Sequence, residues 1–372
     1  MATRKFYSIN YIIVDLPAPQ NLSFAWRFGS LLGLLLSIQI ITGFILSMYY
    51  SSSISTAFER VLHIQREVTG GWALRTLHSN GASLFFLFLY FHMGRGLYYK
   101  SYRGTATWSL GVTIFIISIA IAFIGYLLPW GQIRYWGATV ITNLFSAIPY
   151  VGSRVVQWIW GGYAVGRPTL RRFFAAHFLL PFILVFLVLL HLRSLHNTGS
   201  SNPLGTRSRY KVLFHPYYPR KDIVGFLIIA LLLFGLVFYA PFFLGDPDNW
   251  IPANNIVTPR HIKPEWYFLW VYAILRSIPN KVGGVLAIVI ALGRLLLLPY
   301  ARVKHWFNCR WLFLTVILLT WIGGSPVEAP YTFLGGLFTI LYFILLYIII
   351  IYFRVRLYES HWCCDYGDIP DD

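Results

Sequence analysis

The chain has 372 residues, of which 57% are hydrophobic, 19% aromatic and only 12% charged, and its mean hydropathy is +0.62. This composition excludes a compact soluble domain and is typical of a protein that crosses a membrane several times. The formal net charge of +17 would suit nucleic acid, but the basic residues are scattered among short loops rather than gathered in one stripe. Its cysteines, Cys309, Cys363 and Cys364, lack the spacing of zinc, iron–sulfur or disulfide sites.

Long apolar runs predict an all-α membrane protein with eight transmembrane helices, because about 20 apolar residues cross a bilayer. Two further stretches, about 133–160 and 244–278, are aromatic but interrupted by Gly and Pro, which favours helices lying along the membrane surface. The predicted spans are residues 27–49, 73–99, 107–128, 168–194, 222–243, 279–299, 310–325 and 331–354.

These runs divide the chain into four parts. An interfacial N-terminal segment precedes a bundle of the first four helices, which includes the surface helices near 133–160. A second group of four helices follows, and a polar tail with vicinal cysteines ends the chain. The boundaries that we expect are 1–26, 27–221, 222–356 and 357–372.

Two predicted helices carry histidine pairs with the same spacing, His78 with His92 and His177 with His191. Fourteen residues return to within about 40° of the starting direction and advance about 21 Å, so each pair lies on one helix face near opposite membrane surfaces. Two such helices facing each other would form two stacked bis-His sites. These are typical of non-covalent b-type haem, and no CxxCH motif is present.

An alternative is a proton-coupled or metal-ion transporter that uses these histidines as a relay. That function predicts acidic or polar residues near them, whereas their neighbours are mainly Phe, Leu, Ala and Gly. Burying four unpaired imidazoles in hydrocarbon would be costly, whereas metal ligation gives all four of them a partner at once. The pattern therefore favours two haems.

Glycines on two neighbouring helices repeat the histidine spacing: Gly29 with Gly43, and Gly111 with Gly125. A porphyrin edge between helices needs positions without a side chain, although close packing of small residues would also use them. Arg75 lies three residues before His78, at a helix end where a haem propionate would need a cation. Arg95 lies three residues after His92. Snorkelling topology residues are the alternative for both arginines.

The lysine and arginine distribution predicts the orientation. With eight spans both termini share one side, which holds 18 of the 30 basic residues. The positive-inside rule puts that side on the electrically negative face, matrix or cytoplasm. His92 and His191 then form the inner pair, and His78 and His177 the outer pair.

Together with these pairs, the motifs LPWGQ at 128–132, WGATVITNLFSAIPYVG at 136–152 and PEWY at 264–267 resemble the cytochrome b family, from about residue 20 to 355. This family forms the membrane core of quinol:cytochrome c reductases. The resemblance implies the catalytic subunit of a respiratory complex III in the mitochondrial inner membrane. A bacterial reductase remains an alternative, and the plastoquinol-oxidising homologue, which is split into two chains, does not fit.

The resemblance also implies roles for individual residues. His78 and His177 would ligate the low-potential haem near Arg75, and His92 and His191 the high-potential haem near Arg95, Trp26 and Trp108. Glu265 would accept a quinol proton, and His196 and Asp222 would protonate quinone. The implied quinol-oxidation pocket contains Pro264, Glu265, Trp266, Tyr267, Tyr126 and Gly137, and the quinone-reduction pocket contains His196, Asp222, Lys221 and Ser30.

The implied mechanism is bifurcated oxidation of ubiquinol. One electron would reach a Rieske-type iron–sulfur protein and then a cytochrome c-type subunit, and the other would cross the membrane to reduce quinone, coupled to proton translocation. The family also implies a homodimer, accessory subunits and membrane lipid such as cardiolipin. No nucleic-acid partner is expected.

Overall fold

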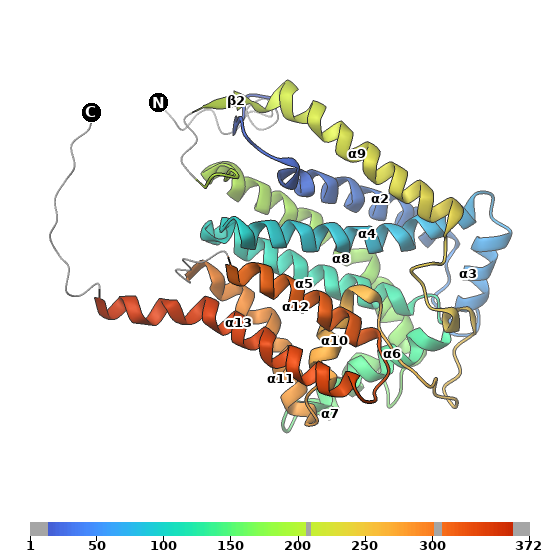
Figure 1. Cartoon of the computed structure of the whole chain (residues 1–372). Coiled ribbons are helices and arrows are strands. Elements are labelled where there is room, and N and C mark those ends of the chain that lie inside the picture. Colours follow the sequence, from blue (N-terminus) through green and yellow to red (C-terminus); the bar gives the residue numbers. More distant parts are fainter. Residues whose placement is uncertain (1–13, 206–209, 301–306, 360–372) are drawn as a thin grey trace, which may run out of the picture.

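The computed structural model describes residues 14–205, 210–300 and 307–359. Eight helical segments lie at the predicted positions, as Figure 1 shows. The all-α class is confirmed. The segments are α2 (Phe28–Tyr49), α4 (Gly71–Tyr98), α5 (Thr105–Leu127), α8 (Arg167–Thr198), α9 (Phe214–Tyr239), α11 (Lys281–Gly293) continued by η7 (Arg294–Tyr300), α12 (Phe307–Gly324) and α13 (Tyr331–Glu359).

Five helical segments of the described chain are long and apolar enough to cross a membrane. Shorter apolar helices cover Cys309–Gly324 and Tyr331–Tyr347, and α4 carries two arginines and two histidines within its 28 residues. The count of eight spans therefore stays a prediction. The five segments are Phe24–Tyr49, Thr105–Leu127, Arg167–Thr198, Phe214–Tyr239 and Lys281–Tyr300.

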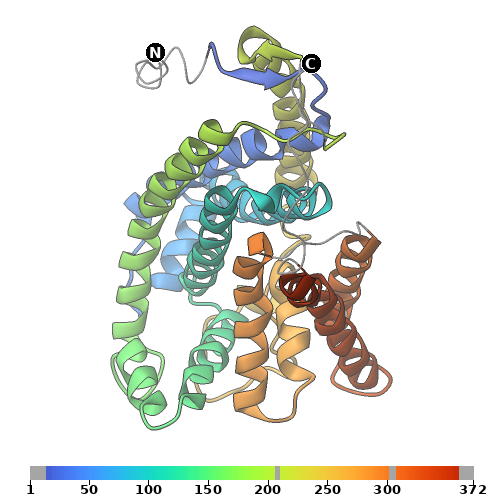
Figure 2. The same ribbon diagram turned by 90° about the vertical axis from the view of Figure 1, so that its left-hand side faces the viewer.

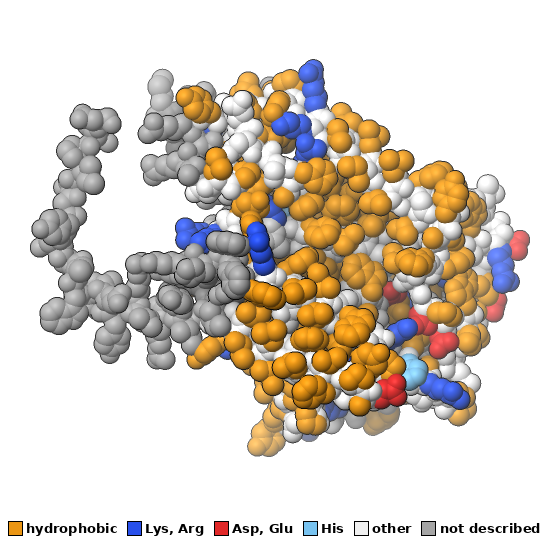
Figure 3. All heavy atoms as spheres, viewed as in Figure 1, with side chains coloured by type: hydrophobic (Ala, Val, Ile, Leu, Met, Phe, Trp, Pro, Cys, Tyr) orange, Lys and Arg blue, Asp and Glu red, His pale blue; other side chains and the backbone are white. Residues whose placement is uncertain are grey.

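The long helices form two groups, which Figure 2 separates when viewed along the bundle. In the first group α2 packs against α4 and α5 against α8, with α9 on the outside of α2 and α4. The second group contains α10 (Leu269–Arg276) to α13. A continuous apolar core joins the groups through Leu31, Phe86, Phe115, Ile274 and Leu319. Figure 3 shows hydrophobic side chains over the broad middle of one face and most charged side chains nearer the helix ends.

Short helices connect the long ones. They are η2 (Phe24–Arg27), α3 (Ala57–Arg66), η3 (Ser101–Arg103), α6 (Gln132–Asn143), η4 (Leu144–Ala147), α7 (Gly152–Trp160), η5 (Pro247–Trp250) and η6 (Trp266–Phe268). Helices α6 and α7 occupy the stretch expected to hold surface helices. In the second such stretch, α10 buries Trp270, Ala273 and Ile274 in the core and packs against α12, which the sequence did not indicate.

The N-terminal segment is fixed by a small sheet that the sequence did not indicate. Strand β1 (Pro17–Pro19) pairs antiparallel with β2 (Lys211–Leu213), with Pro17 opposite Leu213. The Tyr218 hydroxyl also donates to the Pro19 carbonyl. The start of α2 and the end of α13 lie at this same end of the bundle (Figure 1). The expected tail from 360 onward, with Cys363 and Cys364, lies outside the described residues.

Close packing of α12 on α10 yields a stability prediction. A Cβ at Gly323 would lie less than 3 Å from the backbone carbonyl of Leu269, whereas a Cβ at Gly324 would meet only the Leu269 side-chain tip at 3.4 Å. We expect Gly323→Ala to destabilise the fold by about 1–3 kcal/mol, because the helices must separate. Thermal unfolding of the full chain in detergent at one scan rate should show a lower Tm for Gly323→Ala than for Gly324→Ala. Equal Tm values would contradict this packing.

Candidate functional site

The outer histidine pair joins α4 to α8. The ring centroids of His78 and His177 are 6.3 Å apart. The His177 Nδ1–H donates to the Ile121 carbonyl at 2.9 Å. Thr42 Oγ1 donates its own proton to Ile38 and therefore accepts from His78 Nδ1, at 2.8 Å. With Nδ1 of both rings engaged, Nε2 is the nitrogen left for a ligand on each side.

The inner pair lies at the other end of the same helices with a similar ring separation, but its Nδ1 atoms are held differently, since His191 Nδ1 is buried and has no hydrogen-bond partner among the described residues. The ring centroids of His92 and His191 are 6.2 Å apart. Arg95 Nη2 lies 3.3 Å from His92 Nδ1, and its guanidinium carbon is 5.3 Å from the centre of the Trp26 ring. Trp108, on α5, donates its indole N–H to the Leu295 carbonyl at 2.7 Å. Arg95, Trp26 and Trp108 thus lie at this end of the helices, and their role beside a haem stays a prediction.

Both separations suit one metal between two imidazoles. A metal–nitrogen bond of about 2.0 Å on each side, plus about 1.1 Å from each nitrogen to its ring centre, places the centroids about 6.2 Å apart. No group of three or more His, Cys, Asp or Glu side chains in the described ranges could hold a metal ion. The protein therefore presents two imidazoles at each level, which would suit a metal whose other ligands come from a macrocycle.

The paired glycines lie directly against these imidazoles. A Cβ on any of them would approach the Cε1 atom of a histidine on the neighbouring helix, and at Gly125 the approach would be under 3.0 Å. The glycines therefore leave room for the histidine rings themselves, while their role beside a porphyrin edge stays a prediction. The four contacts join Gly29 to His92 at 3.5 Å, Gly43 to His78 at 3.0 Å, Gly111 to His191 at 3.1 Å and Gly125 to His177.

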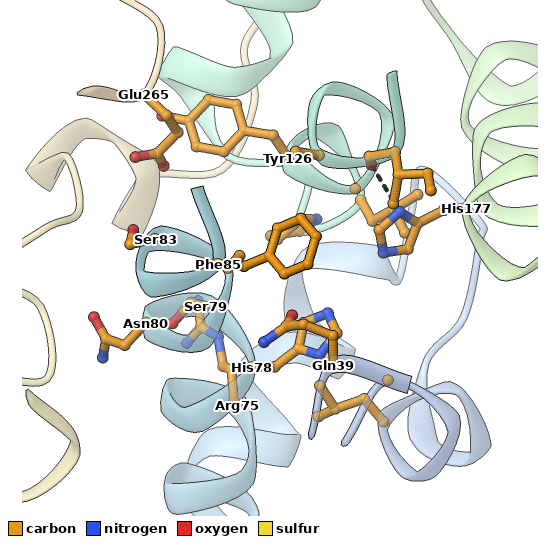
Figure 4. A pocket seen from close by; sticks show the side chains of 18 of the residues that line it. Gln39, Arg75, His78, Ser79, Asn80, Ser83, Phe85, Tyr126, His177 and Glu265 are labelled. Carbon is orange, nitrogen blue, oxygen red and sulfur yellow. Dashed lines mark hydrogen bonds between the residues drawn. The ribbon is translucent and has the colours of Figure 1, made fainter. Parts of the chain in front are cut away.

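A cavity of about 320 Å³ extends from the outer histidine pair toward the PEWY segment. Figure 4 shows Phe85 projecting between the histidines and the end where Tyr126 and Glu265 lie. The space beside the outer histidine pair and part of the predicted quinol pocket are therefore one cavity. Its lining includes His78, His177, Gly43, Gly125, Arg75, Tyr126, Glu265 and Tyr267. Pro264, Trp266 and Gly137, also predicted for this pocket, do not line it.

Helix α4 also holds the PEWY segment. The Tyr267 ring stacks on Phe86 with centroids 4.3 Å apart. The Tyr90 hydroxyl donates to the Tyr267 carbonyl at 2.5 Å and accepts the Trp270 indole N–H at 3.0 Å. Sequence reasoning missed Tyr90 and Trp270, and the signal available was a hydroxyl in an otherwise apolar stretch of α4. These contacts fix the segment that carries Glu265 relative to the histidine helix.

Charged side chains line the outer end of this cavity. Arg134 Nη2 lies 3.7 Å from Glu265 Oε1, and burial raises the pKa of Glu265 while Arg134 opposes that rise. The guanidinium carbon of Arg75 lies 4.4 Å from the centre of the Trp250 ring. Arg75 also donates to Gln65 Oε1 at 3.1 Å. Arg134 was not among the predicted site residues, although a cation within an apolar segment is a functional signal.

The residues predicted for the inner quinone site are brought together in part. The Ser30 side chain lies near the Asp222 carboxylate, while its hydroxyl donates to the Arg27 carbonyl at 2.9 Å. Lys221 Nζ instead lies 4.0 Å from the centre of the Tyr217 ring. His196 is half-buried near the end of α8. The structure therefore supports a contact between Ser30 and Asp222.

Comparisons with known proteins agree with this geometry. A family model described as "Cytochrome b/b6/petB" matches residues 13–199, about half of the chain, and one described as "Cytochrome b(C-terminal)/b6/petD" matches residues 252–343. A solved structure described as "Hyperthermophilic respiratory Complex III" is similar, with 33% identity and a TM-score of 0.88 over 97% of this chain and 98% of that chain. The chain therefore belongs to the cytochrome b/b6 family.

Proposed function

We propose that this chain is the di-haem cytochrome b subunit of a respiratory quinol:cytochrome c oxidoreductase, or complex III. The observation that carries the proposal is the repeated bis-His arrangement, with ring centroids 6.3 and 6.2 Å apart at two levels of one helix pair. The outer level shares its cavity with Glu265. The similarity to a respiratory complex III chain supports the assembly.

His78 and His177 would hold one b-type haem and His92 and His191 the other. Each haem supplies a one-electron redox centre when bound. The two ligand levels are separated by about 21 Å of helix, which covers most of a hydrocarbon core of about 30 Å. Arg75 would face the propionates of the outer haem, and Arg95 with Trp26 and Trp108 those of the inner one. Gly29, Gly43, Gly111 and Gly125 would keep the ligand rings against the neighbouring helices.

At the outer site Glu265 would accept a proton from ubiquinol, since it lines the cavity with Tyr126 and Tyr267. One electron would leave for a Rieske-type protein and a cytochrome c-type subunit, and the other would cross the membrane. At the inner site Ser30 and Asp222 would bind quinone, and His196 and Lys221 would help supply protons.

The proposed setting is an energy-transducing membrane with both termini on the electrically negative side, matching the excess of Lys and Arg there. The mitochondrial inner membrane stays a prediction from the sequence, since the similar complex is described as hyperthermophilic. A homodimer with accessory subunits and bound lipid such as cardiolipin completes the proposal.

The ligand assignment predicts a level-specific loss of haem. His78→Ala and His177→Ala should each abolish the same one of two b-type components, because either change removes an axial ligand of the outer haem. His92→Ala and His191→Ala should abolish the other. His63→Ala, at an exposed position of α3, is the control that should retain both. Reduced-minus-oxidised spectra with redox titration of the purified complex measure this, and loss of both components in every ligand variant would count against two independent levels.

The glycine contacts predict a haem defect without loss of a ligand. Gly125→Ala should displace His177, because the new Cβ would lie under 3.0 Å from its ring. We expect a lower content of the outer b-type haem or a shifted potential. Gly33→Ala on α2, where a Cβ has open space, is the matched control. The same spectra and redox titration measure this effect. Identical haem content and potential in Gly125→Ala and Gly33→Ala would contradict the contact between Gly125 and His177.

Glu265 predicts a pH dependence. Burial raises its pKa above the ordinary value of 4.5, so it should become protonated, and unable to accept a proton, at a higher pH than an exposed glutamate. Turnover should therefore be lost as the pH falls through this raised pKa. Glu265→Gln should lower quinol oxidation by about a hundredfold or more and remove this acid limb. Steady-state rates against pH measure it, with Glu328→Gln at an exposed loop position as control. An unchanged profile in Glu265→Gln would exclude this role.

A further inference from the structure

Arg134 lies in the first turn of α6. Hydrogen bonds join the start of this helix to the segment that follows α9. The Gln132 N–H donates to the Ile251 carbonyl at 2.9 Å, and the Ala253 N–H donates to the Trp130 carbonyl at 3.0 Å. The Gln132 side-chain amide also donates to the Val257 carbonyl, at 2.6 Å. The start of α6 therefore has little freedom to move relative to the cavity.

The Arg134 guanidinium is held by two further contacts inside the cavity. Its Nη2 lies 3.7 Å from Glu265 Oε1, and the two side chains are only 15% and 11% exposed. Its carbon Cζ lies 4.0 Å from the centre of the Tyr126 ring. Figure 4 shows Glu265 beside Tyr126 at the same end of the cavity. The Arg134 Nε–H is buried and has no hydrogen-bond partner among the described residues. The planar guanidinium of Arg134 thus stacks on Tyr126 and pairs with Glu265, and its Nε–H lacks a hydrogen-bond acceptor from the described part of the chain in a mostly apolar cavity.

The surroundings of Glu265 explain why a proton acceptor there needs this cation. Burial disfavours the carboxylate, and Asp246 adds repulsion, whereas Arg134 and the nearby Tyr126 hydroxyl stabilise the charge. Tyr267 also neighbours Glu265. At the rim of the cavity Lys263 pairs with Asp246 at 3.7 Å, and the Lys263 side chain is 50% exposed. Arg134 is thus the cation paired with Glu265, while Lys263 neutralises Asp246 near solvent.

We propose that Arg134 is the positioning residue of the quinol-oxidation site: its guanidinium keeps Glu265 charged and beside Tyr126 until quinol delivers a proton. The inference rests on the proposed function of Glu265. When a quinol O–H bond breaks and an O–H bond forms on Glu265, the carboxyl becomes neutral and the ion pair with Arg134 is lost. Arg134 then no longer holds the carboxyl of Glu265 by charge.

The test is the pH profile of quinol oxidation by the purified complex. Arg134→Gln and Arg134→Met both remove the charge, and the second keeps the aliphatic volume. Each should move the acid limb of the profile to higher pH by about one unit or more. At a pH on the acid side of the limb, this shift corresponds to a rate about tenfold lower than that of the parent. Arg134→Lys keeps the positive charge but loses the planar stack on Tyr126. Its acid limb should therefore lie between those of the neutral variants and the parent. Arg154→Gln, at an exposed position of α7, should behave like the parent.

Combining the changes separates this inference from the proposed function. With Glu265→Gln in place, Arg134→Gln should cause no further change in the profile, because the group it acts through is gone. An unmoved acid limb in both neutral Arg134 variants would overturn the proposal, provided that Glu265→Gln alone still removes the limb. Loss of the haem spectrum in the neutral variants would mark a purely structural residue and also overturn it. If Glu265→Gln retains the parent profile, the proposed role of Glu265 fails first.

Discussion

Four imidazole rings between apolar helices are the constraint on which this structure depends. A neutral imidazole in hydrocarbon needs a partner for each nitrogen, and in the outer pair one nitrogen of each ring is satisfied within the protein. The other needs a ligand, and two facing rings 6.3 Å apart leave space for one metal. The rings reach this position only because the neighbouring helix has glycine opposite each of them. Helix spacing and glycine placement thus follow from one requirement, which is the same one that the proposed metal binding imposes.

The same helix that carries two of these histidines also positions the proposed chemistry. Phe86 and Tyr90 of α4 hold Tyr267 by stacking and by a hydrogen bond, so Glu265 is fixed relative to His78. Helix α6 is tied to the loop after α9 and brings Arg134 to the same carboxylate. The short helix α6 and this loop therefore both position side chains of the site, although neither spans the bundle.

Apolar runs placed the long helices, and equal spacing paired the histidines, because both follow from helix periodicity. Periodicity could not reveal which helix faces another, so Arg134, Tyr90 and Trp270 were missed: their partners are distant in sequence. The burial of α10 was missed because its eight residues between Pro- and Trp-rich segments resemble a surface helix. Pro264 and Gly137 were assigned by resemblance alone, and neither lines the cavity. The pairing of β1 with β2 joins segments nearly 200 residues apart, beyond any local signal.

The most direct test of the account is the haem stoichiometry of the chain. The purified complex should be extracted and its b-type haem determined as the pyridine haemochrome, against the chain measured by quantitative amino-acid analysis. Two non-covalent b haems per chain are predicted, since two bis-His levels are present on α4 and α8. A value of one or zero in intact, folded protein would contradict the account and leave the histidines as a relay.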